Sequence, residues 1–147
     1  MSKLTLSVVA MLGALASAAV AADTVAIQAQ VTTFSPEIVF VNPGDTLAFR
    51  RMATHLVGPV NGMAPAGAAP MASALGKDYD YKVEKEGIYV YRCTVHWAAR
   101  MGGVVVAGKP ANAKEIVEKY KAAATGLDVQ AKFLLDKLLA ELPKHGL

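Results

Sequence analysis

Hydrophobic and polar residues alternate in short segments over the first two thirds of the chain, which is the pattern of half-buried β-strands. In Thr24–Val31 the odd-numbered residues are hydrophobic and most of the others are polar. Ile38–Val41 is a short apolar run, and Thr46–Arg50 restarts the alternation after the turn signal Asn42-Pro43-Gly44-Asp45. We therefore expect these two segments to form a second hairpin-like unit, which ends near His55.

The middle of the chain predicts three further strands and one long connection. Tyr79–Val83, Ile88–Cys93 and Met101–Ala107 have strand-like patterns, while prolines within Gly58–Gly76 argue against any regular element there. Short strands with turn signals at this spacing favour an antiparallel β-sandwich or barrel.

The last third of the chain changes to helix-forming residues. Ala111–Ala124 and Asp128–Leu142 predict two amphipathic helices, separated at Gly126. Their hydrophobic faces would pack on the sandwich, so residues 109–147 form a C-terminal helical extension of it. Binding to a membrane surface is the alternative, but the few lysines of the second helix make a weak basic face.

The N-terminus reads as an export signal. Lys3 precedes an apolar stretch, Leu4–Ala21, which closes on Ala19-Val20-Ala21. A positive start, an apolar core and small residues at the end are typical of a cleaved secretory signal peptide over residues 1–21. An uncleaved membrane anchor is the weaker alternative. We expect a periplasmic protein whose sandwich spans residues 22–108 and which does not insert stably into the membrane.

Charge and length exclude some functions. The chain has 15 basic and 12 acidic side chains, and no run of Lys or Arg stands out, so nucleic-acid binding has no support. The roughly 125 residues left after the signal suit one domain with one core, and we expect a monomer. No room remains for a second, catalytic domain.

One short segment concentrates the metal-ligating residues. Cys93, the only cysteine, is followed by His96 three positions on and Met101 eight positions on, and His55 lies upstream. Two imidazoles, a thiolate and a weak thioether form the ligand set of blue-copper sites. A lone thiol in an exported protein needs burial or a metal. The alternatives are a buried structural cysteine and a core methionine.

These segments together resemble the pseudoazurins, exported cupredoxins with one type 1 copper. The cues are Asn42–Thr46, Gly62–Pro65, Gly87–Tyr89, the loop Cys93–Met101, and Gly103–Val106. The resemblance implies a mainly β fold, a Greek-key cupredoxin sandwich with two C-terminal α-helices. It also implies one copper ion with His55, Cys93, His96 and Met101 as its ligands.

Two positions depart from the pattern of that family. Leu56 stands where an asparagine commonly ties the two ligand-bearing loops together, so this side-chain clasp is missing. Val95 stands where a proline is frequent, and its N–H is a further donor near the thiolate.

The function that the resemblance implies is electron transfer. The protein would shuttle electrons on copper that alternates between Cu(II) and Cu(I), with a nitrite reductase, a cytochrome c or a periplasmic dehydrogenase as partner. It is not expected to be an enzyme, because a second, catalytic copper would need about three further histidines and the chain has three in all. The alternative is a periplasmic protein that carries or stores Cu(I).

A docking face for such a partner is expected around His96, whose ring edge would emerge in an apolar patch. The residues predicted to form this patch, with Arg100 at its edge, are Pro59, Met63, Pro65, Ala66 and Trp97.

Overall fold

The computed structural model describes residues 21–147, and the predicted signal peptide therefore lies outside the described residues except for Ala21. The strands are β1 (Thr24–Gln30), β2 (Thr33–Ser35), β3 (Ile38–Val41), β4 (Thr46–Arg50), β5 (Gly58–Pro59), β6 (Tyr79–Lys82), β7 (Gly87–Arg92) and β8 (Gly102–Ala107). The helices are α1 (Ala113–Ala123) and α2 (Ala131–Glu141), with the 3₁₀ segments η1 (Thr94–Ala99), η2 (Gly126–Gln130) and η3 (Leu142–His145).

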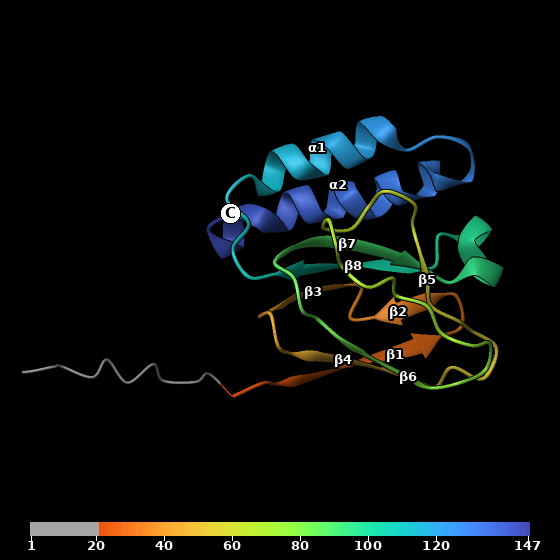
Figure 1. Ribbon diagram of the computed structural model, residues 1–147. Helices are drawn as coiled ribbons and strands as arrows, with labels where there is room; N and C mark the ends of the chain where they lie inside the picture. The colour runs from red at the N-terminus through yellow and green to blue at the C-terminus, as the bar shows by residue number, and fades with distance from the viewer. Residues whose placement is uncertain (1–20) are drawn as a thin grey trace, which may run out of the picture.

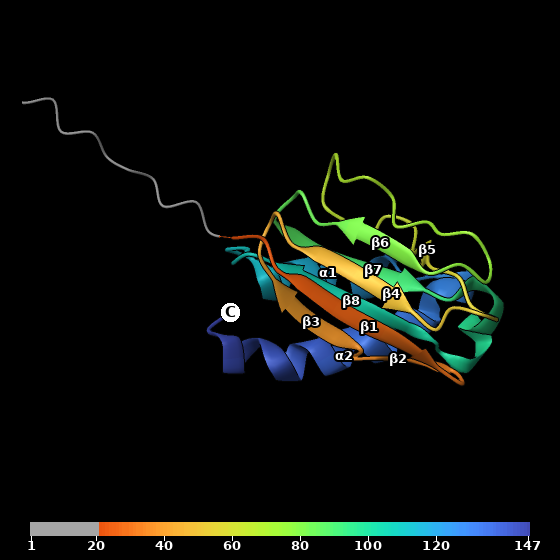
Figure 2. The ribbon, with the colours of Figure 1, turned by 90° about the horizontal axis from the view of Figure 1, so that it is seen from below.

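The elements form three layers (Figure 1). The outer sheet has the strand order β2-β1-β4-β6, and the inner sheet has the order β3-β8-β7-β5. Both helices cover the inner sheet on the face turned away from the outer sheet, as the view from below also indicates (Figure 2). Because the inner sheet is covered on both faces, every residue of β8 is buried.

The predicted two-sheet, mainly β architecture with C-terminal helices is confirmed, but the strand pairing is mixed. β1 pairs with β4 in parallel, and so does β3 with β8. The predicted hairpin of β3 and β4 is wrong, because the turn between them carries the chain from the inner sheet to the outer one. Both strands bury hydrophobic side chains in either arrangement, so the turn signal alone does not fix the partner.

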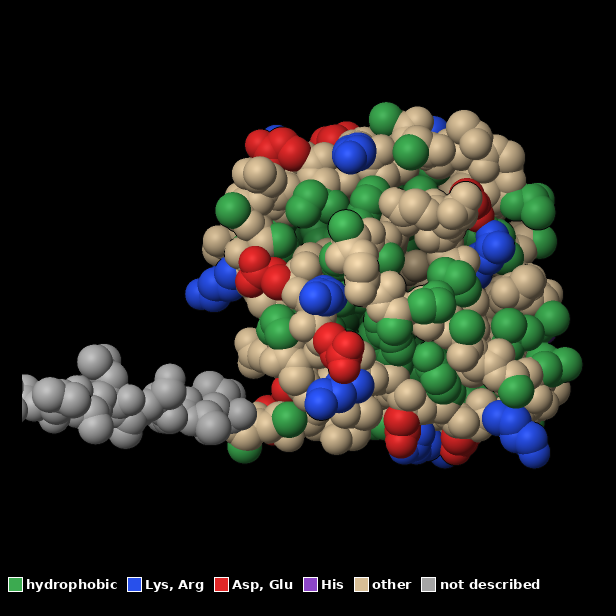
Figure 3. Space-filling model, in the orientation of Figure 1, with side chains coloured by type: hydrophobic (Ala, Val, Ile, Leu, Met, Phe, Trp, Pro, Cys, Tyr) green, Lys and Arg blue, Asp and Glu red, His purple; other side chains and the backbone are tan. Residues whose placement is uncertain are grey.

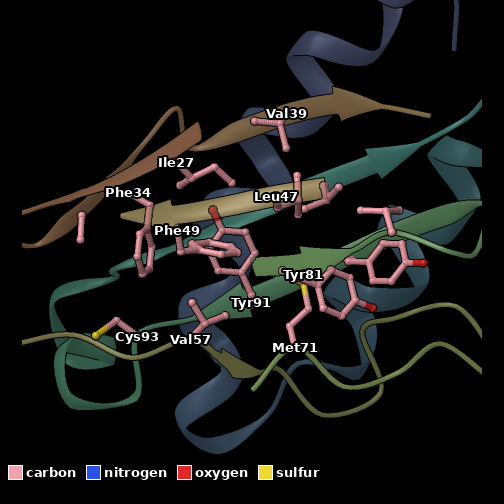
Figure 4. Close-up of a cluster of buried hydrophobic side chains, with 14 of the residues drawn as sticks. Ile27, Phe34, Val39, Leu47, Phe49, Val57, Met71, Tyr81, Tyr91 and Cys93 are labelled. Carbon is pink, nitrogen blue, oxygen red and sulfur yellow. The ribbon is translucent and has the colours of Figure 1, made fainter. Parts of the chain in front are cut away.

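Two hydrophobic clusters fill the spaces between the layers. The first lies between the sheets and contains Phe34, Phe49 and Tyr91, whose rings meet edge to face (Figure 4). Cys93 belongs to this cluster and lies at one end of it. The second cluster joins β7 and β8 to the helices through residues such as Val104, Val106, Leu134 and Leu138.

Several local features differ from the predictions. Val31 is not part of β1: it has a φ of 45° in the turn before β2 and is 87% exposed. The connection Gly58–Gly76 is irregular as predicted, apart from β5 at its start. The start of the second predicted helix, from Asp128, belongs instead to η2.

Within residues 21–147 none of the helices has the length and apolar character needed to cross a membrane.

Candidate metal centre

The segment that carries Cys93, His96 and Met101 is a compact turn between β7 and β8. Cys93 follows the last residue of β7, and η1 then turns the chain back to Arg100, which has a left-handed φ of 63°. The Cys93 N–H donates to the Met101 carbonyl at 2.8 Å, and the His96 N–H donates to the Cys93 carbonyl at 3.1 Å. Antiparallel pairing of Arg92 with Gly102 closes the turn at its base. The three residues are therefore fixed relative to one another by backbone hydrogen bonds.

His55 is carried by the segment between β4 and β5. Its N–H donates to the Met52 carbonyl, and its carbonyl accepts from the Gly76 N–H, both at 2.9 Å. Three residues later, Gly58 pairs with Arg92 next to Cys93. This short ladder ties the two segments together by backbone hydrogen bonds. It does so although Leu56 cannot form the side-chain clasp that an asparagine would provide.

Gly58 brings the two segments especially close. A Cβ at Gly58 would lie only 2.7 Å from Oγ1 of Thr94, the residue after Cys93. Real Cβ atoms essentially never approach a neighbour this closely, so an alanine here would force Thr94 or the backbone to shift. Residue spacing did not predict this contact, for which Gly58, three positions after His55, was the available signal.

The structure brings His55, Cys93 and His96 together at one point. Their possible ligand atoms all lie within 4.8 Å of one another. Nδ1 of His55 is 3.2 Å from Nδ1 of His96, and the Cys93 sulfur is 3.8 Å and 3.5 Å from these two nitrogens. Both imidazoles thus turn the same type of nitrogen toward the sulfur.

These separations fit a shared metal ion. Bonds of about 2.0 Å to nitrogen and about 2.3 Å to sulfur, as at zinc, would hold the three donors roughly 3.3–3.8 Å apart. The measured separations of 3.2, 3.5 and 3.8 Å are close to this range. Thiolate and imidazole together suit copper, whereas harder cations prefer oxygen.

Burial prepares His55 for metal binding. The side chain is buried, and its pKa is lowered from the ordinary value of an imidazole. Burial is the main cause, and the nearby His96 is the second. A lowered pKa favours the neutral imidazole, which is the form that ligates metals. Cys93 is fully buried as well, whereas His96 is partly exposed. Of these three residues, His96 is therefore the one that reaches the surface.

Met101 is placed beside this cluster by its backbone. It is fully buried, it accepts the hydrogen bond from Cys93, and its own N–H donates to the His96 carbonyl at 3.3 Å. A thioether is a weak, soft ligand, which is the type that blue-copper sites use in the axial position.

The predicted docking face is partly wrong. Met63 and Trp97 are only 2% and 4% exposed, because Met63 and Trp97 pack in the cluster under the helices. Val95, at 54% exposure, is instead the large hydrophobic residue that the turn presents beside His96. In the view of Figure 3, hydrophobic side chains are present at the right-hand side of the molecule, where Figure 1 draws η1.

The remaining histidine and three methionines lie elsewhere or have packing roles. The ring of His145 stacks on Phe40, with ring centroids 3.5 Å apart, and stays exposed. Met52, Met63 and Met71 are all buried in the hydrophobic clusters. Figure 4 shows Met71 beside Tyr81, which is a core position.

Comparison with known proteins gives a consistent result. Residues 21–108 match the sequence profile of the copper-binding proteins of the plastocyanin/azurin family. The pseudoazurin of Methylorubrum extorquens is 36% identical over 76 residues, which are 51% of this chain and 51% of that protein. This match thus spans about half the length of that relative. The pseudoazurin of Paracoccus pantotrophus is 28% identical over 110 residues, or 74% and 72% of the two chains.

Solved structures extend the similarity to the helices. The crystal structure of pseudoazurin from Methylobacterium extorquens AM1 superposes with a TM-score of 0.68 at 28% identity, over 81% of this chain and 98% of that one. Native pseudoazurin from Hyphomicrobium denitrificans superposes with a TM-score of 0.64 at 29% identity, over 78% and 97% of the two chains.

Proposed function

Since this chain belongs to the plastocyanin/azurin family of copper-binding proteins, we propose that it is a periplasmic electron carrier with one type 1 copper site. The ligands are His55, Cys93, His96 and Met101. The observation that carries the proposal is the convergence of two imidazole nitrogens and one cysteine sulfur within 4.8 Å. Bound copper would supply a one-electron couple between Cu(II) and Cu(I).

The surrounding residues suit a carrier that changes little between its two states. Hydrogen bonds within the turn and the ladder from Gly58 to Arg92 hold the ligands in place before any metal binds. The hydrophobic cluster around Cys93 excludes water from the thiolate. A fixed, dry site needs little rearrangement when the charge changes, which favours fast electron transfer.

Burial also favours electron transfer over copper delivery. Cys93 and Met101 are fully buried and His55 nearly so, which leaves the edge of His96 as the exposed part of the ligand set. A delivery protein must release its ion to a partner, for which exposed, exchangeable ligands are suited. An electron can leave through His96 without any ligand being released.

A visible spectrum of the copper-loaded protein tests the proposal. We expect an intense thiolate-to-copper band in the red part of the spectrum, which bleaches reversibly on reduction. Cys93→Ser should abolish the band, and Met101→Leu should shift its position and the reduction potential. Met63→Leu is the matched control, because this methionine is buried outside the proposed ligand set. A colourless protein that gives its copper to weak chelators would instead support the carrier or storage function.

Location and partner are further parts of the proposal. The apolar segment Leu4–Ala21 supports export, and N-terminal sequencing of protein from a periplasmic extract tests it, with cleavage expected before Ala22 or Asp23.

A redox protein such as a nitrite reductase, a cytochrome c or a dehydrogenase would dock at His96. Exposed Lys77, which lies at the end of β6 nearest His55, would help to steer it if its surface is acidic, whereas the strand pairing puts Lys82, Lys85 and Lys109 at the opposite end of the sheets. The rate of electron transfer should then fall with ionic strength, and a rate independent of salt would contradict steering.

A further inference from the structure

Two arginines flank the ligand-bearing turn, and both reach the same part of the C-terminal extension. Arg92 precedes Cys93, and its guanidinium Nη1 lies 2.6 Å from Oδ1 of Asp128 in η2. Arg100 precedes Met101, and its Nε donates to the side-chain oxygen of Gln130 at 3.2 Å. Cys93 and Met101 thus each follow an arginine whose side chain contacts η2.

The ion pair of Arg92 with Asp128 is more than a loose surface contact. The side chains of Arg92 and Asp128 are only 26% and 24% exposed, so water screens this pair less than a typical surface ion pair. The Arg92 Nε is buried and has no hydrogen-bond partner among the described residues. Asp128 is therefore the main compensation for a partly buried guanidinium.

Trp97 links the same extension to His96, which precedes it. Its ring lies 6.0 Å from the Arg92 guanidinium carbon. A Cβ at Gly102 would lie 2.9 Å from the Trp97 ring and 3.0 Å from Leu134 of α2. The indole therefore packs over the backbone of β8, close to α2.

We propose that η2 and the start of α2 form a brace for the ligand-bearing turn. Asp128 and Gln130 are positioning residues in this arrangement: Asp128 acts through Arg92 on Cys93, and Gln130 acts through Arg100 on Met101. The contact of the Arg100 guanidinium with the Phe133 ring, 5.2 Å from its centroid, reinforces the second connection. This inference rests on the proposed ligand set for its effect on copper, but its effect on the turn does not require metal.

The first test is amide hydrogen exchange on the metal-free, full-length protein. In Asp128→Asn we expect exchange at His96, Arg100 and Met101, whose N–H groups hydrogen-bond within the turn, to become at least threefold faster. Amides in the centre of β7 and β8 should be unchanged. Uniform acceleration across both strands would show a general loss of stability and would overturn the brace, as would no change within the turn.

Asp136→Asn is the matched control. It removes the same charge from the same extension and breaks an ion pair of 2.8 Å with Lys121, at a site that pairs with α1 and not with the turn. We expect it to leave exchange in the turn unchanged. Equal acceleration in both variants would overturn the specific role of Asp128.

A double-mutant cycle tests the route through Arg92. If Asp128 acts through this arginine, the variant with both Arg92→Gln and Asp128→Asn should exchange no faster in the turn than Arg92→Gln alone. If the exchange rates in the double variant instead rise by the product of the two single effects, Asp128 does not act through Arg92.

The copper-loaded protein gives a readout that a merely structural role would not move. Asp128→Asn should shift the thiolate-to-copper band and the reduction potential, while Asp136→Asn should leave both as in the wild type. If the wild type itself has no such band, the proposed ligand set fails. Hydrogen exchange in the metal-free protein then still tests whether η2 and the start of α2 support the turn.

Discussion

At the residue scale, the buried tyrosines show how much a hydroxyl group depends on its partner. Tyr91 is fully buried, and its hydroxyl has no hydrogen-bond partner among the described residues. Tyr89 is equally buried, but its hydroxyl donates to the Lys85 carbonyl at 2.6 Å. An unpaired buried hydroxyl is unfavourable, whereas a paired one contributes about 0.5–1.5 kcal/mol.

Removal of the two hydroxyls should therefore have opposite effects on stability. We expect Tyr91→Phe to keep or raise the free energy of unfolding, by up to about 2 kcal/mol, and Tyr89→Phe to lower it by about 1 kcal/mol. Urea denaturation of both variants under the same conditions measures the difference. If Tyr91→Phe is the more destabilising of the two, its hydroxyl has a stabilising partner and this account of the core is wrong.

A second residue-scale prediction concerns the contact between Gly58 and Thr94. Gly58→Ala should lower the free energy of unfolding by about 1–3 kcal/mol, because its Cβ would lie 2.7 Å from the Thr94 hydroxyl. Thr94→Ala in the same chain should recover most of this loss, since it removes the obstructing oxygen. Thermal unfolding of the two single variants and the double variant measures the coupling, and strictly additive losses would mean that the strain lies elsewhere.

At the element scale, the sequence predicted strands and helices better than their partners. Periodicity located β3 and β4 at their observed bounds, because one local pattern suffices to identify a strand. It could not show that these strands lie in different sheets, because pairing depends on residues far away in the chain. The cupredoxin fold expected from the resemblance is confirmed by the solved relatives.

The same limit applies to the metal centre. The spacing of Cys93 and His96 indicated a shared site because a short turn brings them together, and His55 followed from the need for a second imidazole. Nothing in the local sequence showed that Trp97 turns inward or that Asp128 contacts Arg92, since both depend on the packing of the C-terminal extension. Long-range contacts of this kind cannot be read from spacing.

Packing of α2 gives an element-scale prediction. Leu138→Ala should lower the free energy of unfolding by about 2–5 kcal/mol, because its side chain is fully buried against the inner sheet and α1. Lys132→Ala is the control on the same helix, exposed and expected to change stability by less than about 0.5 kcal/mol. Chemical denaturation followed by circular dichroism compares them, and a Leu138→Ala variant as stable as Lys132→Ala would contradict the role of burial.

At the scale of the whole molecule, the inner sheet joins the two hydrophobic clusters into one cooperative unit. Alternate residues of β7 point to opposite sides: Tyr89 and Tyr91 belong to the cluster between the sheets, and Ile88 and Val90 to the cluster under the helices. Neither cluster can be exposed without disrupting the other face of the same strand. Wild type and Leu138→Ala should therefore each unfold in a single transition.

Alkaline pH offers a final prediction for the molecule as a whole. Burial raises the pKa of Tyr81 to about 12, and burial also raises the pKa values of Tyr89 and Tyr91. Because a folded-state pKa above the unfolded value of about 10 favours the neutral phenol, the folded state binds more protons than the unfolded state between the two values. This stabilisation is fully present below about pH 10 and is lost as the pH rises through the folded-state pKa.

We therefore expect the free energy of unfolding to fall between about pH 10 and pH 12, by at most about 1.4 kcal/mol per pH unit for each such phenol. Urea denaturation at a series of pH values measures the slope. Tyr81→Phe should make the slope shallower, because one phenol with a raised pKa is then missing. A slope unchanged in this variant would mean that other groups cause the alkaline unfolding, and a stability that stays constant up to pH 12 would contradict the raised pKa values themselves.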